Sequence, residues 1–238
     1  MDNLGENEKK NEILNKINTF CVPYVLGEIE DNITEFYIES VRFSGEKVIK
    51  IAIKYHLEGN ILMAAKYYKY LISKGFSDHR LFSNYGIILQ SFNKIDEAEI
   101  LTRKAIDLKP DYAIAYSNLG GILIDLGKLE EAEFYTRRAL ELNPIIDKAQ
   151  INLGIIYRNR GKLEEAELYI RKAIELNSKL SKAYFVLSNF KCLINDKRWE
   201  DQLFSESIFY KQLDENKIDI YFARANLLHK EKRYKESA

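Results

Sequence analysis

The amino-acid sequence predicts an all-α protein built as a solenoid of stacked antiparallel helix pairs. The first observation behind this prediction is an interval of 34 residues, which separates Gly86 from Gly120 and Gly120 from Gly154. A fixed period of this length is typical of a repeated helix–turn–helix unit. The second observation is that alanines recur in two registers of the same period: Ala98, Ala132 and Ala166, and Ala105, Ala139 and Ala173.

The unit over residues 113–147 shows both helices of one repeat. Apolar residues between Tyr116 and Leu126 recur at three- and four-residue spacing, as one face of a helix requires. Gly127 ends this helix, because glycine tolerates the left-handed conformation found after a helix C-terminus. A second helix is expected over residues 129–142, where Pro144 stops it.

The same phase divides most of the chain into about five repeats and an incomplete last one. The repeats start near residues 45, 79, 113, 147, 181 and 218. The last interval is longer than the others, and Trp199 aligns with Leu163 only if the preceding turn has extra residues. Gln202 and Phe209 then replace the small alanines, so we expect this hairpin to pack less closely. Trp199 is predicted to fill the resulting gap as a hydrophobic plug rather than to stack on a ligand.

The recurring small residues have a structural purpose in this interpretation. Gly120 and Ala132 are predicted to lie where the two helices of a hairpin cross closely, and Ala139 where the hairpin meets the next one. Glycine inside a helix costs about 0.5–1 kcal/mol relative to alanine. Its recurrence in one register therefore indicates that the close approach is needed.

The two ends of the chain depart from the period. Residues 1–44 carry no repeat; a short polar helix is expected over 7–18 and an extended segment over 19–24. We expect this N-terminal segment to be partly disordered or to cap the first hairpin of the solenoid over 45–238. At the other end a first helix is predicted over 220–228, and its partner only begins before the last residue. The sequence thus suggests a natural truncation or a piece of a longer protein.

Composition limits the possible partners and compartments. The chain has 36 basic residues (lysine and arginine) and 36 acidic residues (aspartate and glutamate). It therefore lacks the net positive charge that would favour binding to nucleic acid or to a membrane surface. Cys21 and Cys192 lie far apart, and three histidines are scattered, so no metal-ligand spacing exists. With no signal peptide and no apolar run of about 20 residues, we expect a reduced, cytoplasmic protein without a cofactor. Its oligomeric state is left open.

Catalytic motifs are missing from the sequence. It contains no Gly-rich phosphate loop, no Gly-x-Ser-x-Gly turn and no His-Glu-x-x-His pair. The acidic and basic pairs of the second helices, such as Glu130-Glu131 and Arg137-Arg138, recur with the repeat and are interpreted as a solvated outer face. The chain by itself is not expected to be an enzyme.

The repeated residues resemble the tetratricopeptide repeat. Its pattern of a large residue, Leu-Gly, an aromatic or aliphatic residue, two alanines and proline appears here as Tyr116, Leu119-Gly120, Leu123, Ala132, Ala139 and Pro144. The resemblance covers about residues 45–238 and is most specific in the middle three repeats. It implies a right-handed superhelix whose first helices line a concave face.

An asparagine stands two residues before each of the three glycines, at Asn84, Asn118 and Asn152. An amide offers donors and an acceptor, so such a ladder can bind the backbone of an extended peptide; a similar ladder is found in the repeat region of O-linked N-acetylglucosamine transferases. The alternative is that the asparagines bond neighbouring hairpins to each other, and both roles can hold at once. The other residues expected on this concave face are Arg80, Ser83, Ser117, Asp125, Lys148, Arg158 and Asn159.

Two functions are compatible with these features. The first is a scaffold for protein–protein interaction that binds an extended segment of a partner protein in the concave groove. The second is a non-catalytic, substrate-presenting arm of a larger enzyme, because residues 199–204, 220–226 and 232–237 are similar to the last repeats of bacterial proteins that carry a C-terminal sulfotransferase domain. The phosphosulfate-binding loop of such a domain is absent from the sequence.

Overall fold

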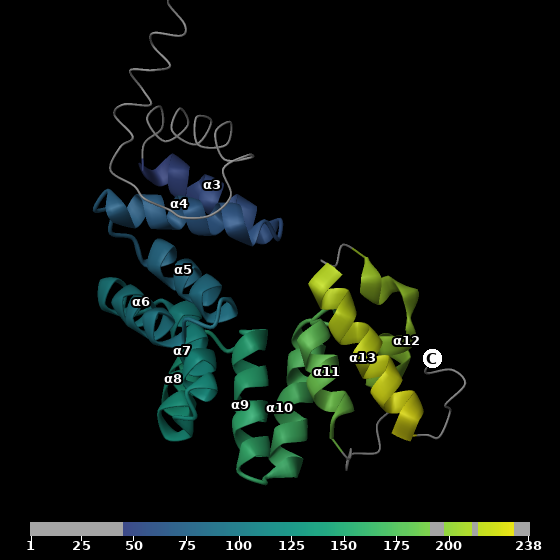
Figure 1. Ribbon diagram of the computed structural model, residues 1–238. Helices are drawn as coiled ribbons and strands as arrows, with labels where there is room; N and C mark the ends of the chain where they lie inside the picture. Colours follow the sequence, from purple (N-terminus) through teal and green to yellow (C-terminus); the bar gives the residue numbers. More distant parts are fainter. Residues whose placement is uncertain (1–44, 191–197, 211–213, 231–238) are drawn as a thin grey trace, which may run out of the picture. The chain divides into compact units, whose positions relative to one another are not determined.

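The computed structural model describes residues 45–190, 198–210 and 214–230. These residues form eleven α-helices and one short 3-10 helix, with no strand among them (Figure 1). The elements are α3 (Gly45–Leu57), α4 (Ile61–Ser73), α5 (His79–Ser91), α6 (Ile95–Leu108), α7 (Ala113–Asp125), α8 (Leu129–Leu142), α9 (Asp147–Asn159), α10 (Leu163–Leu176), α11 (Ser181–Ser188), α12 (Arg198–Phe204), η1 (Glu206–Phe209) and α13 (Asp214–Lys230). The predicted all-α fold is confirmed.

Helices α3 to α10 pair in sequence into four hairpins, each with a tight turn. The turn residue has a positive φ in all four, at Gly59, Asn93, Gly127 and Gly161, with φ between 60° and 77°. Glycine adopts this left-handed conformation without steric cost, and asparagine tolerates it better than other side chains. The turn predicted at Gly127 is confirmed, and Asn93 serves the same role without glycine.

The close crossing predicted inside each hairpin is also confirmed. A Cβ atom placed on Gly120 would lie 2.1 Å from Thr136 Oγ1 and 3.4 Å from the carbonyl oxygen of Ala132. A Cβ atom placed on Gly86 or on Gly154 would lie 3.2 Å from the corresponding carbonyl oxygen of the next helix, that of Ala98 or Ala166. Ala132 is completely buried. The small residues therefore allow the first and second helices to approach at this register.

Successive hairpins stack mainly through the second helix of one hairpin and the first helix of the next, as α6 against α7 and α8 against α9. First helices also meet directly: α7 contacts both α5 and α9, whereas no two of the described second helices α4, α6, α8 and α10 pack comparably against each other. Between hairpins, Ala105 of α6 packs with Phe82 and with Ala115 of the next first helix, which is the contact predicted for the second set of alanines.

One carboxylate of α6 and one of α8 reach the following hairpin. Glu133 of α8 accepts hydrogen bonds from Arg137 of its own helix, from Arg160 in the next turn and from the hydroxyl of Tyr157 in α9. Glu99, 34 residues earlier, is bonded in the same way by Arg103 and Lys128. These carboxylates are mostly shielded from solvent, so the interpretation of all second-helix charges as a solvated face is only partly right.

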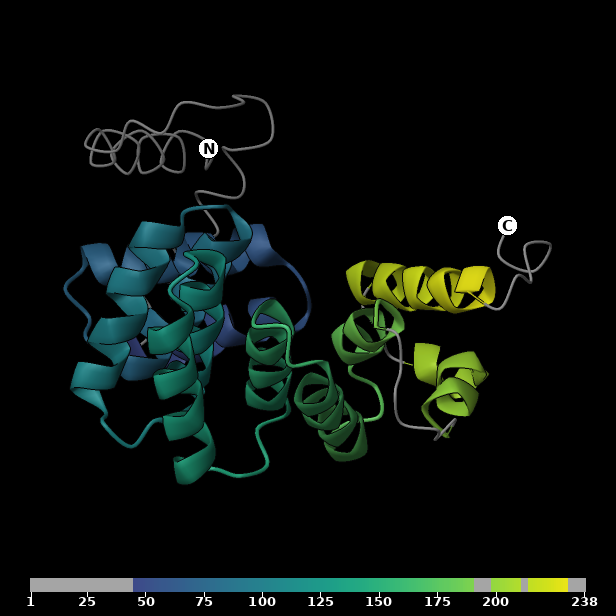
Figure 2. The same cartoon turned by 90° about the horizontal axis from the view of Figure 1, so that it is seen from below.

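The fifth hairpin departs from the pattern, as its sequence predicts. Helix α12 has only seven residues and ends where Ser205 caps η1 through a hydrogen bond from Ser207 N to its hydroxyl. The main partner of α11 is α13, which lies beside it (Figure 1, Figure 2). Lys230 at the end of α13 donates to the carbonyl oxygens of Ser188 and Phe190, and so satisfies the C-terminus of α11.

Three expectations concern residues outside the described ranges: the helix over 7–18, the extended segment over 19–24 and the second helix of the last repeat. The first helix of the last repeat, α13, begins at Asp214. The sequence predicts that this repeat starts near residue 218 and that its helix starts at residue 220. Among the described helices, none has the length and hydropathy needed to cross a membrane.

Candidate functional site

The three ladder asparagines all lie toward the preceding hairpin. Asn118 is 7% exposed, and its Nδ2 donates to the Ser83 hydroxyl at 2.9 Å. Asn152 Nδ2 donates to the carbonyl oxygen of Ser117 at 2.8 Å. Asn84 lies beside the hydroxyl of Tyr68 in α4. Asn118 and Asn152 therefore bond neighbouring hairpins, which is the alternative that the sequence left open.

A common offset explains how the first helices meet. The pairs Asn118–Ser83 and Asn152–Ser117 are each 35 residues apart, one repeat plus one residue. Gln90 and Asp125 keep the same offset, and Gln90 Nε2 donates to Asp125 Oδ2 at 2.6 Å. Asp125 was predicted from the sequence and Gln90 was not, although the offset of 35 residues could have identified Gln90.

Asn226 was also missed by the sequence analysis. Its Nδ2 donates to the Ser188 hydroxyl at 3.2 Å, across a separation of 38 residues. This separation is three residues longer than the 35 residues found between the other pairs. The predicted last repeat interval, from 181 to 218, is also three residues longer than the regular interval of 34. The stretch Asn226-Leu227-Leu228 matches Asn118-Leu119-Gly120, and that match was the available signal.

Gln90, Asp125 and Asn152, together with Gly121, form a surface over three consecutive first helices, which we call the first-helix face. Its members are Gln90 of α5, Gly121 and Asp125 of α7, and Asn152 of α9. A Cβ atom on Gly121 would lie 3.6 Å from Asn152 Nδ2, 3.7 Å from Asn152 Oδ1 and 4.0 Å from Gln90 Nε2. The two amides therefore lie close to Gly121. Unlike Gly120, this glycine is not required by a close helix crossing, because a Cβ atom there would meet no clash.

The remaining predicted residues divide into two groups. Arg80 is engaged by Glu46 and Asp78 in ion pairs of 2.5 and 2.8 Å, and Ser83 and Ser117 are buried, so these three serve the fold. Lys148 and Asn159 are exposed. Arg158 makes only a long 3.5 Å contact with the Asn159 side chain.

Lys148 extends the first-helix face toward α3. It lies four residues before Asn152 on α9, which places both on one side of that helix. Burial lowers the pKa of His56 in α3, and the positive charge of Lys148 lowers it further. Lys148 makes no side-chain hydrogen bond or ion pair to any described residue, so its charge is available to a bound molecule.

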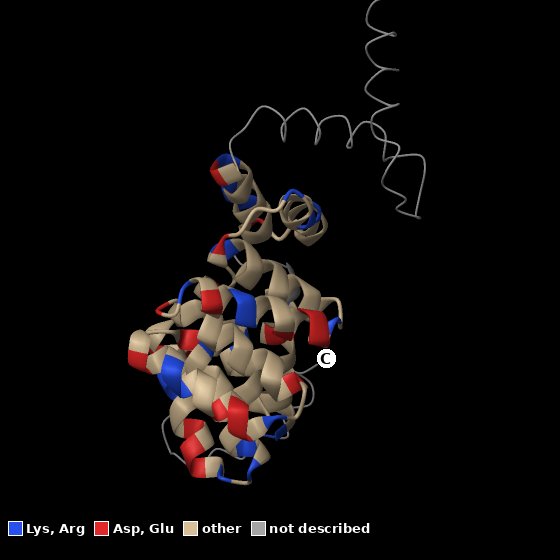
Figure 3. Ribbon diagram, turned by 90° about the vertical axis from the view of Figure 1, so that its left-hand side faces the viewer, with Lys and Arg blue, Asp and Glu red and all other residues tan. Residues whose placement is uncertain are grey.

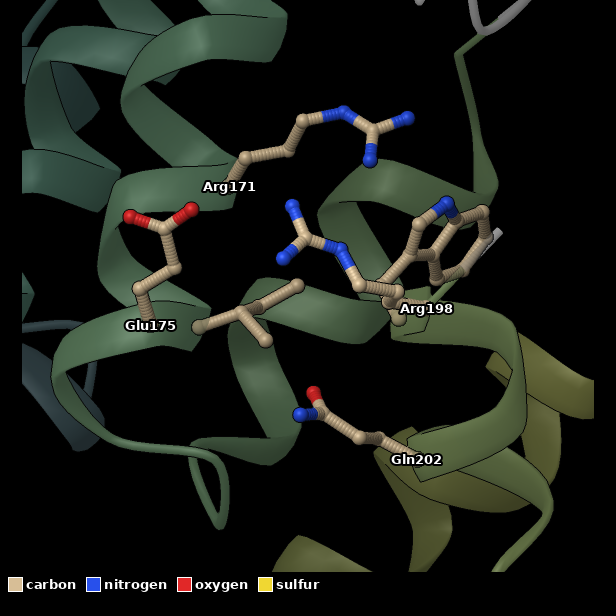
Figure 4. A pocket seen from close by; sticks show the side chains of 6 residues that line it. Arg171, Glu175, Arg198 and Gln202 are labelled. Carbon is tan, nitrogen blue, oxygen red and sulfur yellow. The ribbon is translucent and has the colours of Figure 1, made fainter. Parts of the chain in front are cut away.

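A pocket of about 90 Å³ opens between α10 and α12 (Figure 4). Trp199 forms part of its wall and is only 3% exposed, so its predicted role as a plug is confirmed. Arg171, Glu175 and Arg198 bring charges of both signs to the rim, and Arg171 is paired with Glu167 at 2.7 Å. Pockets for small-molecule ligands usually measure about 300–1,000 Å³, so this one is too small to be the main site.

Charges of both signs are interspersed over the helices rather than gathered into one field (Figure 3). Within the described ranges, no three His, Cys, Asp or Glu side chains are grouped so that they could hold a metal ion. The first-helix face is therefore the best candidate for a functional surface.

Replacing Asn118 by alanine tests the structural role of the ladder. We expect the free energy of unfolding to fall by about 1–2 kcal/mol, because the buried Ser83 hydroxyl loses its partner. Urea denaturation followed by circular dichroism measures this change. Asn159→Ala is the control, since this exposed side chain has only the long contact to Arg158. Equal effects of the two substitutions would contradict the assignment.

Comparison with known proteins agrees with this architecture. The family model of the tetratricopeptide repeat matches residues 113–145 and 148–180, so the chain contains tetratricopeptide repeats. A comparison with curated protein sequences gives no significant match. Nothing in these comparisons supports the expected similarity to sulfotransferase-linked repeats or to O-linked N-acetylglucosamine transferases.

Two solved structures, those of TTC0263 and PilF, show the same fold. TTC0263, a thermophilic TPR protein of Thermus thermophilus, is 14% identical with a TM-score of 0.57, and the match covers 82% of this chain and 98% of that one. PilF of Pseudomonas aeruginosa is 20% identical with a TM-score of 0.54, covering 82% and 86%. MamA (41-end) of Desulfovibrio magneticus RS-1 is 18% identical with a TM-score of 0.49, covering 81% and 96%.

Proposed function

We propose that the protein is an interaction scaffold that binds an extended segment of a partner protein on its first-helix face. The observation that carries this proposal is the position of Gly121 beside the amides of Gln90 and Asn152, on three consecutive first helices. Repeat proteins of this kind present extended surfaces rather than enclosed pockets. The presence of tetratricopeptide repeats supports an interaction role.

The chemistry of this face suits a peptide backbone. Each amide uses one donor inside the fold, Gln90 toward Asp125 and Asn152 toward Ser117. Its carbonyl oxygen can still accept an N–H group, and a backbone offers one such donor at every residue other than proline. Since Gly121 has no side chain, a bound chain can approach α7 closely. Lys148 at the edge would favour a partner segment that carries an acidic residue.

Selection of peptides from a displayed library against the full chain tests this proposal. The selected peptides are expected to lose at least about tenfold in affinity for Gly121→Trp, because the indole fills the space between the amides. Peptides with an acidic residue should also bind Lys148→Glu more weakly. Isothermal titration or fluorescence anisotropy gives both changes.

Lys69→Glu is the matched control, because it makes the same charge change at an exposed position of α4, on a second helix. Circular dichroism must show unchanged helicity for all three variants. If the selected peptides bind Gly121→Trp as tightly as the wild type, the first-helix face is not the binding surface.

A further inference from the structure

Three large apolar side chains are exposed in one register on the second helices. Ile100 of α6, Phe134 of α8 and Leu168 of α10 are 66%, 65% and 57% exposed. Each lies 34 residues after the last, so the stacked hairpins place them in a row across the outer surface. We call this set the apolar row. A single exposed apolar residue is ordinary, but a contiguous set with a polar rim marks an interaction surface.

The apolar row has rims of opposite charge. Three residues before each member is a glutamate, and four residues after each member is a basic residue; positions i, i+3 and i+7 share one helix face. The second helices run in the same direction in successive hairpins, so each rim keeps one sign along the row. The rim residues, all exposed, are Glu97, Glu131 and Glu165 on the acidic side and Lys104, Arg138 and Lys172 on the basic side.

The row ends within the solenoid. In α4 the equivalent position is held by Lys66, which is exposed. Beyond α10, the short α12 does not form a regular hairpin with α11. The surface therefore spans three hairpins, the same three that carry the regular period.

We propose that the apolar row is the contact surface of a homodimer whose two-fold axis runs parallel to the row. Such an axis sets each apolar residue against its own counterpart and each acidic rim against the partner's basic rim, so the same patch is used on both copies, as in an isologous interface. At 1.5 Å per residue the two rims lie roughly 4.5 and 6 Å from the row along the helix, so opposite charges meet nearly in register. An axis across the row would instead place acidic rim on acidic rim.

The surface favours a second copy of this chain because it is complementary to itself. The symmetric arrangement sets Glu165 against Lys172 of the second copy, and neither has an ion-pair partner among the described residues. Glu97, Glu131 and Arg138 already pair with Lys94, Arg103 and Glu141 of their own chain. Electrostatic complementarity of this kind fixes the orientation of an interface. The equal numbers of basic and acidic residues, 36 each, mean that two copies do not repel each other through net charge. A standard interface buries roughly 800 Å² of surface on each partner. The three side chains of the apolar row form a smaller contact than this, so the dimer forms only at high concentration.

Sedimentation velocity of the full chain over a series of concentrations tests the proposal. The wild type is expected to shift from monomer to dimer as its concentration rises into the high micromolar range. Phe134→Asp, at the centre of the row, should weaken association at least about tenfold. Ile145→Asp makes the same change at a residue that is 70% exposed but lies off the row, and it should leave association unchanged. A wild type that stays monomeric, even if another protein binds the row, would overturn the proposal.

A charge exchange in α10 tests the predicted symmetry. Glu165 and Lys172 are exposed and have no ion-pair partner among the described residues, so changing them leaves the fold intact. Glu165→Lys and Lys172→Glu should each weaken self-association, because each places like charges opposite one another. An equimolar mixture of the two variants should recover the dimer, since each lysine then faces a glutamate. If the mixture associates no better than either variant alone, the proposed two-fold axis is wrong.

Discussion

Replacing Gly120 by alanine is expected to lower the free energy of unfolding by about 1–3 kcal/mol, the usual cost of overpacking. The new Cβ would lie 2.1 Å from Thr136 Oγ1 and 3.4 Å from the carbonyl oxygen of Ala132. Thr136 is β-branched and restricted at χ1 inside a helix, so α7 and α8 must separate. Alanine is the better helix former by about 0.5–1 kcal/mol, which is too little to compensate.

The neighbouring Gly121 is a matched control in the same helix. Its Cβ would meet nothing closer than 3.6 Å, so Gly121→Ala should gain the helix propensity without the clash. We expect its free energy of unfolding to rise by about 0.5–1 kcal/mol. Urea unfolding followed by circular dichroism gives both values. Shifts of the same sign for the two variants would show that the crossing at Gly120 is not as close as described.

Replacing Glu133 by glutamine should lower the free energy of unfolding by about 1–3 kcal/mol at neutral pH, the range found for hydrogen bonds to charged groups. The carboxylate is shared by Arg137, Arg160 and Tyr157, and the last two belong to the next hairpin. A neutral amide cannot satisfy two guanidinium groups. The junction between α8 and α9 should therefore weaken.

The loss should depend on pH in a defined direction. Burial alone would raise the pKa of Glu133, but the hydrogen bonds from Arg137, Arg160 and Tyr157 outweigh it and hold the pKa below its ordinary value of 4.5. A carboxyl group with a depressed pKa stabilises the folded state above its unfolded pKa, and this stabilisation is lost as the pH falls through the folded value. The wild type and the variant should therefore converge in acid.

Glu141→Gln is the control for this series. Its carboxylate is exposed and pairs only with Arg138 of the same helix, at 2.8 Å. Exposed pairs contribute little, so we expect a small effect at every pH. Thermal or urea unfolding measured from neutral to acidic pH gives both curves. A difference between Glu133→Gln and the wild type that persists unchanged in acid would contradict the role of the carboxylate.

The regular hairpins could be predicted from the sequence because their local constraints repeat. Gly120 needs a close crossing and Gly127 a left-handed turn, and both requirements act within one hairpin. The fifth hairpin could only be predicted to be irregular. Which helix pairs with α11 depends on contacts of α13 more than 35 residues away, such as those of Asn226 and Lys230.

The site was predicted less completely than the fold. The asparagines were identified from their register, but the direction of each amide depends on the 35-residue offset between first helices. Gly121 was not selected, because it has no counterpart one repeat away. The shared role of Glu133 was hidden for a different reason, since the nearby glutamates of the same helix, Glu130 and Glu131, do lie in solvent.

The arrangement of contacts has a consequence for how the protein loses structure. Among the described helices, each hairpin makes its extensive contacts with its sequence neighbours, so no single core unites α3 with α13. Stability in such an array is a sum of unit and junction energies. The middle hairpin of α7 and α8 has a junction on each side, whereas the terminal hairpin of α3 and α4 has one such junction, to α5. The described helices therefore form a gradient of local opening energies rather than one cooperative block.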